Sequence, residues 1–223
     1  MKTEVQTTPN LANKTTVVRG LLTELLRGDW QAADRLTEAH ACERYHVSRT
    51  PVREAFFELQ GLGLLEIRRN CGAVVLPFNT KHLRDIYSVR TLLEVEATRL
   101  ATGQANREQM DAMVEAFESL RKSDEKDPGW RNDIELHRFI AESSGNPRLA
   151  SEIARYGYLI QTIREIVGEH VQDIHTTSAD QHLAILYGLQ SGEPDKAANA
   201  MRTHLLQASD SATKAMESIF KSS

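Results

Sequence analysis

The first 78 residues alternate between stretches with the apolar period of a helix and stretches typical of strands. The pattern predicts three helices near 17–26, 37–45 and 48–60, and two strands near 64–69 and 72–78. Thr37 and Ser48 are natural N-cap residues for the second and third helices, and Gly72 suits the turn between the strands. Three helices followed by a hairpin predict a winged helix-turn-helix.

From residue 79 the strand signals stop and long amphipathic helices take over. Breaks that contain glycine or proline separate helices expected near 80–102, 106–122, 128–143, 147–168, 178–190 and 193–218. This pattern predicts an all-α bundle of six or seven helices. The expected organisation is mainly α, with a flexible tail over 1–15, a winged helix-turn-helix domain over 16–78 and an all-helical domain over 79–223.

Composition and charge narrow the class of protein. Hydrophobic residues make up 40% of the 223 residues, which is enough for a buried core. No apolar run approaches the ~18 residues of a membrane span, the N-terminus lacks a signal-peptide pattern, and the two cysteines have no metal-type spacing. We therefore expect a cytoplasmic protein with no membrane partner. The net charge is −4, yet six arginines lie between positions 35 and 69, which weakly favours DNA contact by the first domain.

The third predicted helix begins with the sequence SRTPVREA, which places Arg49 and Arg53 one turn apart on one face. The second helix of a helix-turn-helix lies in the major groove, where each guanidinium can donate two hydrogen bonds to a guanine. The same helix N-terminus carries two hydroxyl residues, Ser48 and Thr50, which are suited to hydrogen bonds with phosphate oxygens. The alternative is a solvated helix face on which Arg53 pairs with a nearby acid, such as Glu54 or Glu43.

The segment RLTEAHACERYHVSRTPVREAFFELQGLGLLEIRRNCGAVV resembles the DNA-binding domain of GntR-family bacterial transcription regulators. The later segments IYSVRTLLEVEATRLA, DIELHRFIAESSGNPRL, DQHLAIL and AMRTHL resemble the FCD ligand-binding domain of the FadR subfamily. The resemblance implies a dimeric repressor or activator that binds operator DNA and responds to a small metabolite, commonly an organic acid. It also implies that Arg49 and Arg53 contact the major groove and that Gly72 is the wing tip. The chain departs from the family at His46, where glycine is usual, and at Cys71, where a basic residue is common.

Three predicted helices of the second domain each turn a histidine toward their apolar side. Asp133 and His137 are spaced i, i+4 and share a helix face, while His182 and His204 lie on apolar stripes of later helices. One such histidine is most often a hydrogen-bonded core residue, but three with a carboxylate are hard to bury without a shared partner. A divalent metal would satisfy all four groups, with zinc favoured and nickel, iron or manganese possible.

The metal-binding FCD regulators show a similar pattern of Asp-x-x-x-His followed by two later histidines. Four protein ligands around an octahedral ion would leave two positions open for a carboxylate effector. Arg90 and Glu94 form a further i, i+4 pair. They either form a helix-stabilising ion pair, or Arg90 faces the pocket and anchors the carboxylate of the effector. His170 and His175 fall in a polar stretch and are left out of the site.

The sequence thus predicts a transcription regulator that senses a small organic acid at a metal and is not an enzyme. The first alternative is a metal sensor without an organic effector, which would use the same four ligands. The second is a metal-dependent hydrolase, because a metal with open positions can activate water. No general base is evident beside the ligands, since Glu135 points to a different helix face from Asp133 and His137.

Overall fold

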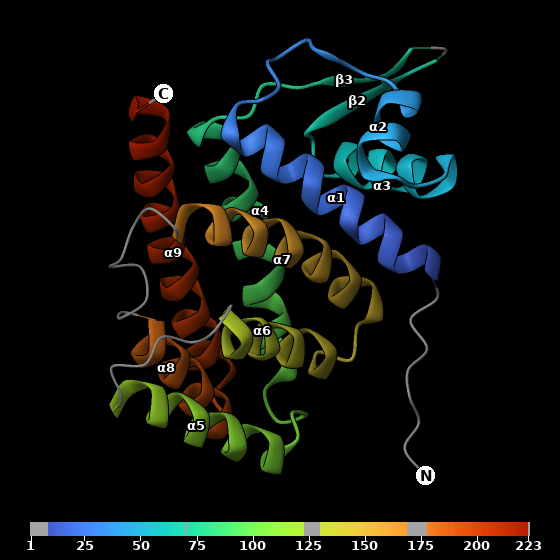
Figure 1. Ribbon diagram of the computed structural model, residues 1–223. Coiled ribbons are helices and arrows are strands. Elements are labelled where there is room, and N and C mark those ends of the chain that lie inside the picture. The colour runs from blue at the N-terminus through green and yellow to red at the C-terminus, as the bar shows by residue number, and fades with distance from the viewer. Residues whose placement is uncertain (1–8, 70, 123–129, 169–177, 223) are drawn as a thin grey trace. The chain divides into compact units, whose positions relative to one another are not determined.

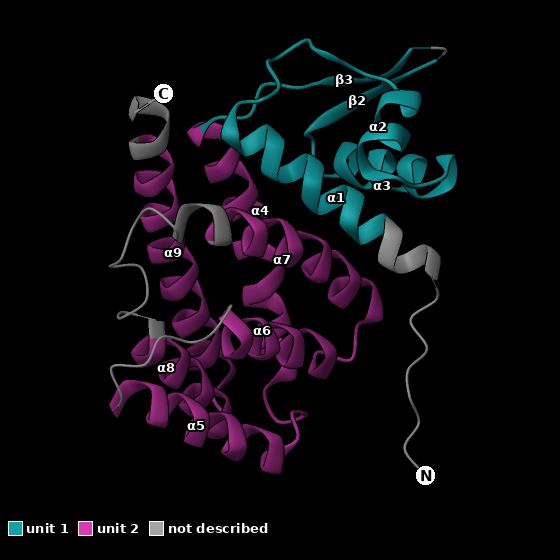
Figure 2. Ribbon diagram, viewed as in Figure 1, with its two compact units in different colours: residues 1–79 teal, residues 80–223 magenta. Residues whose placement is uncertain are grey.

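The structure is a computed structural model that describes residues 9–69, 71–122, 130–168 and 178–222. The chain divides into two compact units, residues 1–79 and 80–223 (Figure 1 and Figure 2). His170 and His175 lie outside the described residues, as do the first eight residues of the expected tail.

Unit 1 consists of three helices and a small sheet: α1 (Pro9–Arg27), β1 (Arg35–Leu36), α2 (Glu38–Tyr45), α3 (Arg49–Gly61), β2 (Leu65–Arg68) and β3 (Gly72–Val75). The apolar face of α1 is buried, and α1 packs mainly on α3. The three strands form an antiparallel sheet in the order β1-β3-β2. This arrangement confirms the predicted winged helix-turn-helix.

Two features of unit 1 differ from the sequence-based expectation. Helix α1 begins at Pro9, so residues 9–15 are helical where a tail was expected. Its polar first turns carry little apolar period, whereas its buried face starts at Val17 and Val18. Strand β1 was not predicted, because its two residues, which pair with β3, are too few to show a period.

The turn between α2 and α3 depends on a residue in a left-handed conformation. Thr37 caps α2 as expected, since its Oγ1 accepts a hydrogen bond of 3.2 Å from the backbone N–H of His40. His46 ends the helix with φ 53° and ψ 44°, and its N–H donates to the carbonyl of Cys42. Glycine adopts this conformation without steric cost, which explains why the usual glycine suits this position.

Unit 2 is an all-α bundle whose apolar core lies between its helices. Its elements are α4 (Thr80–Ala101), α5 (Arg107–Lys122), α6 (Arg131–Ser143), α7 (Pro147–Gly168), α8 (Ser178–Gln190) and α9 (Pro194–Ser222). Helix α9 packs along α4 and α8, α5 covers α8, and α6 lies on α4 and α7 (Figure 1). Large apolar side chains from all six of these helices make the core, among them Val95, Phe117, Leu136, Ile140, Ile153, Leu186, Met201 and Leu205. Six described helices agree with the predicted bundle.

A glycine allows α8 and α9 to approach closely. A Cβ built on Gly188 would lie 2.7 Å from the Cα of Ala197, so no larger residue fits between these helices. The approach brings the rings of His182 and His204 to a centroid distance of 4.6 Å. Among the described residues, no helix is both long enough and apolar enough to span a membrane.

Candidate functional site

The exposed start of α3 forms one wall of a groove in unit 1. The groove has a volume of about 710 Å³ and is lined by Arg49, Arg53 and Gly72 together with further basic and aromatic side chains. Ser48 and Thr50 are exposed at the start of the same helix but do not line the groove. Although Ser48 is the N-cap residue, its hydroxyl makes no capping hydrogen bond.

Arg53 forms an ion pair, but with a different partner from those considered from sequence. Its Nε donates to Oε1 of Glu38 at 2.7 Å, rather than to Glu43 or Glu54, and its side chain remains 57% exposed. Arg49 forms no ion pair with any residue in the described ranges. The pair with Glu38 therefore orients the Arg53 side chain at the mouth of the groove without burying it.

The groove also contains residues that sequence reasoning missed: Arg35, Phe57, Arg68 and Arg69. Phe57 follows Arg53 by one helical turn and is 64% exposed, so its place on the same face was readable from the spacing. Arg35 lies in β1, and its Nε donates a 2.6 Å hydrogen bond to the backbone carbonyl of Cys71. That contact was not predictable, because it depends on the pairing of β1 with β3.

Gly72 is required by the backbone of the wing. Its φ is +82°, and a Cβ at this position would lie 2.3 Å from the carbonyl oxygen of Leu36. Both the left-handed conformation and the approach of β1 exclude a side chain here. The glycine therefore shapes the wing whether or not it contacts DNA.

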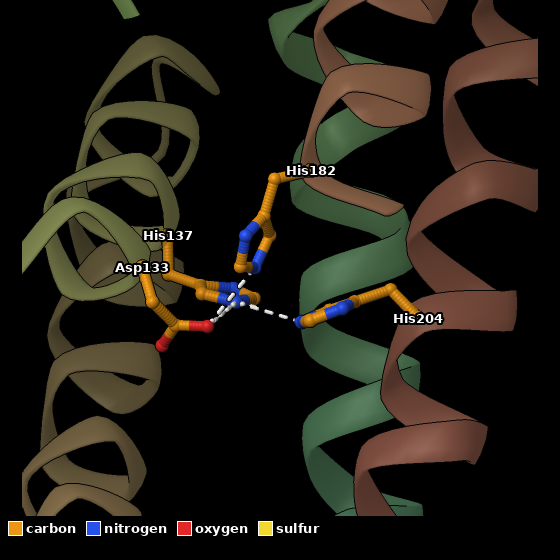
Figure 3. Close-up of side chains that lie close together, drawn as sticks. All are labelled: Asp133, His137, His182 and His204. Carbon is orange, nitrogen blue, oxygen red and sulfur yellow. Dashed lines mark hydrogen bonds and ion pairs between the residues drawn. The ribbon is translucent and has the colours of Figure 1, made fainter. Parts of the chain in front are cut away.

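In unit 2, four predicted ligands converge in the interior (Figure 3). Asp133 and His137 project from α6, His182 from α8 and His204 from α9, and all four side chains are buried. One ligand atom from each lies within 4.8 Å of the others. Nε2 of His182 lies 3.0 Å from Oδ1 of Asp133, and Nε2 of His137 lies 3.2 Å from Nε2 of His204.

Residues around the cluster orient the imidazole rings. Nδ1 of His137 contacts Oε2 of Glu94 on α4, and Nδ1 of His204 lies 2.9 Å from Oε1 of Gln181 on α8. Because both acceptors face Nδ1, the proton of each ring belongs there and the lone pair of each Nε2 points inward. Two such lone pairs at 3.2 Å repel each other unless a cation lies against them. The donor set therefore fits a divalent metal ion with imidazole and carboxylate ligands.

The electrostatics of the cluster keep its groups in the protonation states that bind metal. Burial lowers the pKa of His182 and holds that of His204 well below its usual value, so both are neutral near pH 7. Burial alone would raise the pKa of Asp133, but Arg164, whose Nη1 donates to Oδ2 of Asp133, and the nearby histidines outweigh it and lower the pKa. Asp133 is therefore ionised.

Arg90 links the ligand cluster to a cavity. Two nitrogens of Arg90 bind Oε1 of Glu94 at 2.6 and 2.7 Å, while Oε2 of Glu94 contacts His137. Burial opposes ionisation of Glu94, but the charge of Arg90 and the hydrogen bonds from His137 and Arg90 prevail and lower its pKa to about 2. The remaining Nη1 of Arg90 is buried and has no hydrogen-bond partner among the described residues. The expected i, i+4 ion pair is thus present, and Arg90 also has a donor to spare.

The cavity lies between α6 and α7, and its volume is about 460 Å³. Arg90, Asp133, His137 and Arg164 line it, so it opens onto the ligand cluster. His182 and His204 do not line it. Sequence reasoning missed Arg164, Gln181 and the role of Glu94 as a bridge; only Arg164, which with Glu165 interrupts an apolar stretch of α7, left a signal.

Comparison with known proteins agrees with both units. Residues 13–75 match the family described as bacterial regulatory proteins, gntR family, and residues 85–207 match the FCD domain. A probable D-xylose utilization operon transcriptional repressor of Paenarthrobacter nicotinovorans is 27% identical over 187 residues, which cover 83% of this chain and 82% of that protein. The HTH-type transcriptional repressor NanR of Escherichia coli (strain K12) is 26% identical over 181 residues, which cover 72% of this chain and 69% of NanR.

Solved structures share the fold. Escherichia coli McbR/YncC superposes with a TM-score of 0.61 at 20% identity, over 87% of this chain and 94% of that one. A GntR family member from Pseudomonas syringae pv. tomato str. DC3000 has a TM-score of 0.56 at 24% identity, over 95% and 89% of the two chains. The matched family and the curated relatives are transcription regulators and not enzymes, which excludes the hydrolase alternative. The DNA-binding fold of unit 1 and the helical bundle of unit 2 thus lead to one conclusion: this chain belongs to the GntR family of bacterial regulatory proteins and carries an FCD domain.

Proposed function

We propose that this protein is a repressor that binds operator DNA as a dimer and releases or engages it in response to a small organic acid, sensed beside a metal ion in the FCD domain. The observation that carries the sensing role is the shared boundary between the ligand cluster and the cavity. Asp133 and His137 belong to both, and Arg90 lines the cavity with a buried Nη1 that has no hydrogen-bond partner among the residues the structure describes. The curated relatives named as repressors support the direction of control.

In the DNA-binding unit, Arg49 and Arg53 contact base edges in the major groove, each able to donate two hydrogen bonds to a guanine. The exposed hydroxyls of Ser48 and Thr50 contact phosphate oxygens, and the backbone at Gly72 carries the wing toward the duplex. One recognition helix covers few base pairs, so a dimer reads two half-sites about 34 Å apart. Sedimentation of the protein with a duplex selected from a random-sequence pool tests this, and a 1:1 complex of monomer and duplex would contradict it.

In the FCD domain, Asp133, His137, His182 and His204 hold a divalent ion, zinc in first place, with nickel, iron or manganese also compatible with the donors. When bound, the ion supplies a positive charge and a Lewis acid beside the cavity. Arg90 anchors the carboxylate of the effector through Nη1. Because Glu94 joins Arg90 to His137, an acid bound at Arg90 also changes the surroundings of the ligand set.

The response is a shift of populations between two arrangements of the dimer. The acid binds one arrangement more tightly, and the two arrangements space the recognition helices differently. A pure metal sensor is the remaining alternative. The cavity and the spare donor of Arg90 favour the organic acid, since a metal sensor needs neither.

The decisive experiment is a titration of the selected duplex with zinc-loaded and chelator-treated protein, with and without a panel of organic acids. We expect the acids to change DNA affinity only when the protein is metal-loaded and Arg90 is intact. Arg90→Ala should abolish the response, whereas Arg84→Ala, an exposed arginine on the same helix, should not. A response to zinc alone, unchanged by every acid, would favour the metal sensor. Purified protein that binds no metal would refute the metal site.

A further inference from the structure

The wall of the cavity away from the ligand cluster is mostly apolar, and a glycine leaves part of it open. We propose that the effector is an organic acid with a hydrocarbon body that lies against Gly157, and not a polyhydroxylated sugar acid. This inference rests on the proposed function, since it assumes that an acid binds in this cavity. It adds the chemical class of the acid and a residue that determines specificity.

The buried charged groups that line the cavity lie beside the ligand cluster. Arg90 and Arg164 lie there beside Asp133 and His137, and both guanidiniums are largely buried. Arg164 is already paired with Asp133, whereas Nη1 of Arg90 has no partner in the described part of the chain. This end can hold one carboxylate head.

The rest of the wall offers little to a body that carries hydroxyls. It is formed largely by Ile134 and Ala141 of α6 and by Ile153, Ala154, Gly157 and Ile160 of α7. Ser151, Tyr158 and Gln161 also line it, but Tyr158 and Gln161 already interact within the protein. Arg138 and Glu142 line its exposed side and pair with each other at 3.1 Å. A sugar acid would therefore lose most of its hydration without replacement, while a hydrocarbon body would gain by leaving water.

The size of the cavity points to a body of several carbon atoms. Its volume of about 460 Å³ falls within the range that small ligands fill in proteins, roughly 300–1,000 Å³. An acid as small as acetate would contact only the charged end. The apolar wall therefore has a function only if the acid extends along α7.

No close contact within the described part of the chain explains Gly157, in contrast to two other glycines within helices. A Cβ on Gly20 would lie 2.4 Å from Tyr45, and one on Gly188 would lie 2.7 Å from Ala197, so close contacts explain both glycines. A Cβ on Gly157 would meet no described residue within 4 Å, and Gly157 lies in the interior of α7, where glycine weakens a helix. Since Gly157 lines the cavity, the missing side chain leaves space for the body of the ligand.

The test compares four probe acids on the full-length, zinc-loaded protein by thermal-shift titration and calorimetry. Hexanoate and benzoate carry a hydrocarbon body, gluconate carries hydroxyls, and acetate is only a head. We expect hexanoate or benzoate to bind roughly tenfold or more tightly than gluconate. Gluconate binding as tightly as both would overturn the proposed class, while leaving an acid-sensing function intact.

Substitutions at Gly157 test the wall itself. Gly157→Leu should weaken the binding of hexanoate by roughly tenfold or more and leave acetate unchanged, whereas Arg155→Leu, on α7 outside the cavity, should change neither. Gly157→Ala should raise the melting temperature of the ligand-free protein by about 2–4 °C, as expected for a better helix former. Unchanged hexanoate binding by Gly157→Leu would refute the role of Gly157. If the wild type binds none of the four acids, the acid-sensing function fails together with this inference.

Discussion

The groove of unit 1 and the ligand cluster of unit 2 both depend on pairs of arginine and carboxylate, but in opposite environments. Arg53 and Glu38 pair at the protein surface, where their side chains are 57% and 29% exposed. Arg90 and Glu94 pair in the interior, where their side chains are 3% and 2% exposed. Water screens the first pair, whereas the charges of the second have lost their hydration and depend on each other.

This difference predicts which property each region controls. Removal of a groove arginine exposes no buried charge, so binding should change while stability does not. Removal of one member of the buried network leaves the other charged and unsolvated, so stability and ligand binding should both change. The second environment suits a metal ion, because burial lowers the pKa of His182 and His204 and Arg164 holds the ionised Asp133 in place.

Glu94→Ala should have the largest effect, because it leaves the charge of Arg90 buried and removes the acceptor of His137. We expect a loss of about 3–5 kcal/mol in the free energy of unfolding, measured by urea denaturation. Glu96→Ala, an exposed carboxylate on the same helix, is the control and should change stability by no more than about 0.5 kcal/mol. Equal effects of the two substitutions would show that the buried network is not special.

His204→Ala should lower metal affinity by more than the roughly 10–100-fold that loss of an outer hydrogen-bond partner costs. Gln181→Ala removes such an outer partner of His204 and should fall within that range. Thr203→Ala, exposed on α9, should retain the metal. Elemental analysis and competition with a chromogenic chelator measure all three. DNA affinity without effector should survive in His204→Ala, and a variant that loses its metal yet responds fully to the acid would reduce the ion to a structural role.

Arg49→Ala or Arg53→Ala should weaken operator binding by about 1–3 kcal/mol and relax the preference for one G·C pair. The melting temperature should barely change, since both side chains are exposed. Arg27→Ala, exposed at the end of α1 and outside the groove, is the matched control. Binding is measured by fluorescence anisotropy with several duplex sequences and at several salt concentrations. Loss of a phosphate contact would lower the affinity for every sequence equally and reduce the salt dependence, whereas loss of a base contact changes the preference between sequences. Wild-type affinity in both variants would refute the groove assignment.

The metal-free protein should lose stability as pH falls below about 6.5. The pKa values of His182 and His204 are depressed in the folded state, so these groups bind protons more readily when unfolded. Above the unfolded pKa both imidazoles are neutral in either state, and the free energy of unfolding is unaffected. Below it the unfolded state takes up protons first, so the free energy of unfolding falls by up to about 1.4 kcal/mol per pH unit for each imidazole. Urea denaturation from pH 7.5 to 5 in chelator measures the slope. His204→Ala should reduce it, and an unchanged slope would contradict the assigned role.

His46→Gly should have the smallest effect and the opposite sign. The left-handed conformation of His46 is unfavourable for a residue with a Cβ, so glycine should stabilise the protein by roughly 1 kcal/mol. DNA affinity should not change, because the backbone geometry is retained. Cys42→Gly, in the interior of α2, provides the contrast and should destabilise. Destabilisation by His46→Gly would show that the imidazole has a role beyond the turn.

Much of the fold could be predicted because its signals are local. Apolar periods and glycine or proline breaks located all the described helices of unit 2, although α9 continues to Ser222, past its expected end at 218. The same reasoning brought Asp133 and His137 to one face and selected His182 and His204, which the structure places together. The early start of α1 and the strand β1 were missed, because polar first turns and a two-residue strand carry no period.

The sequence by itself determined which residues could act: the arginines of SRTPVREA, the carboxylate and three imidazoles, and Arg90. The tertiary structure decided what surrounds them. Glu94 lies 43 positions from His137 in the chain, and Gln181 lies 23 positions from His204, yet these contacts set the tautomers of the two ligands. The partner of Arg53 and the open space at Gly157 were decided in the same way. Periodicity shows which face a residue occupies, but hydrogen bonds and cavities depend on which faces meet, and only the packing of helices distant in sequence settles that.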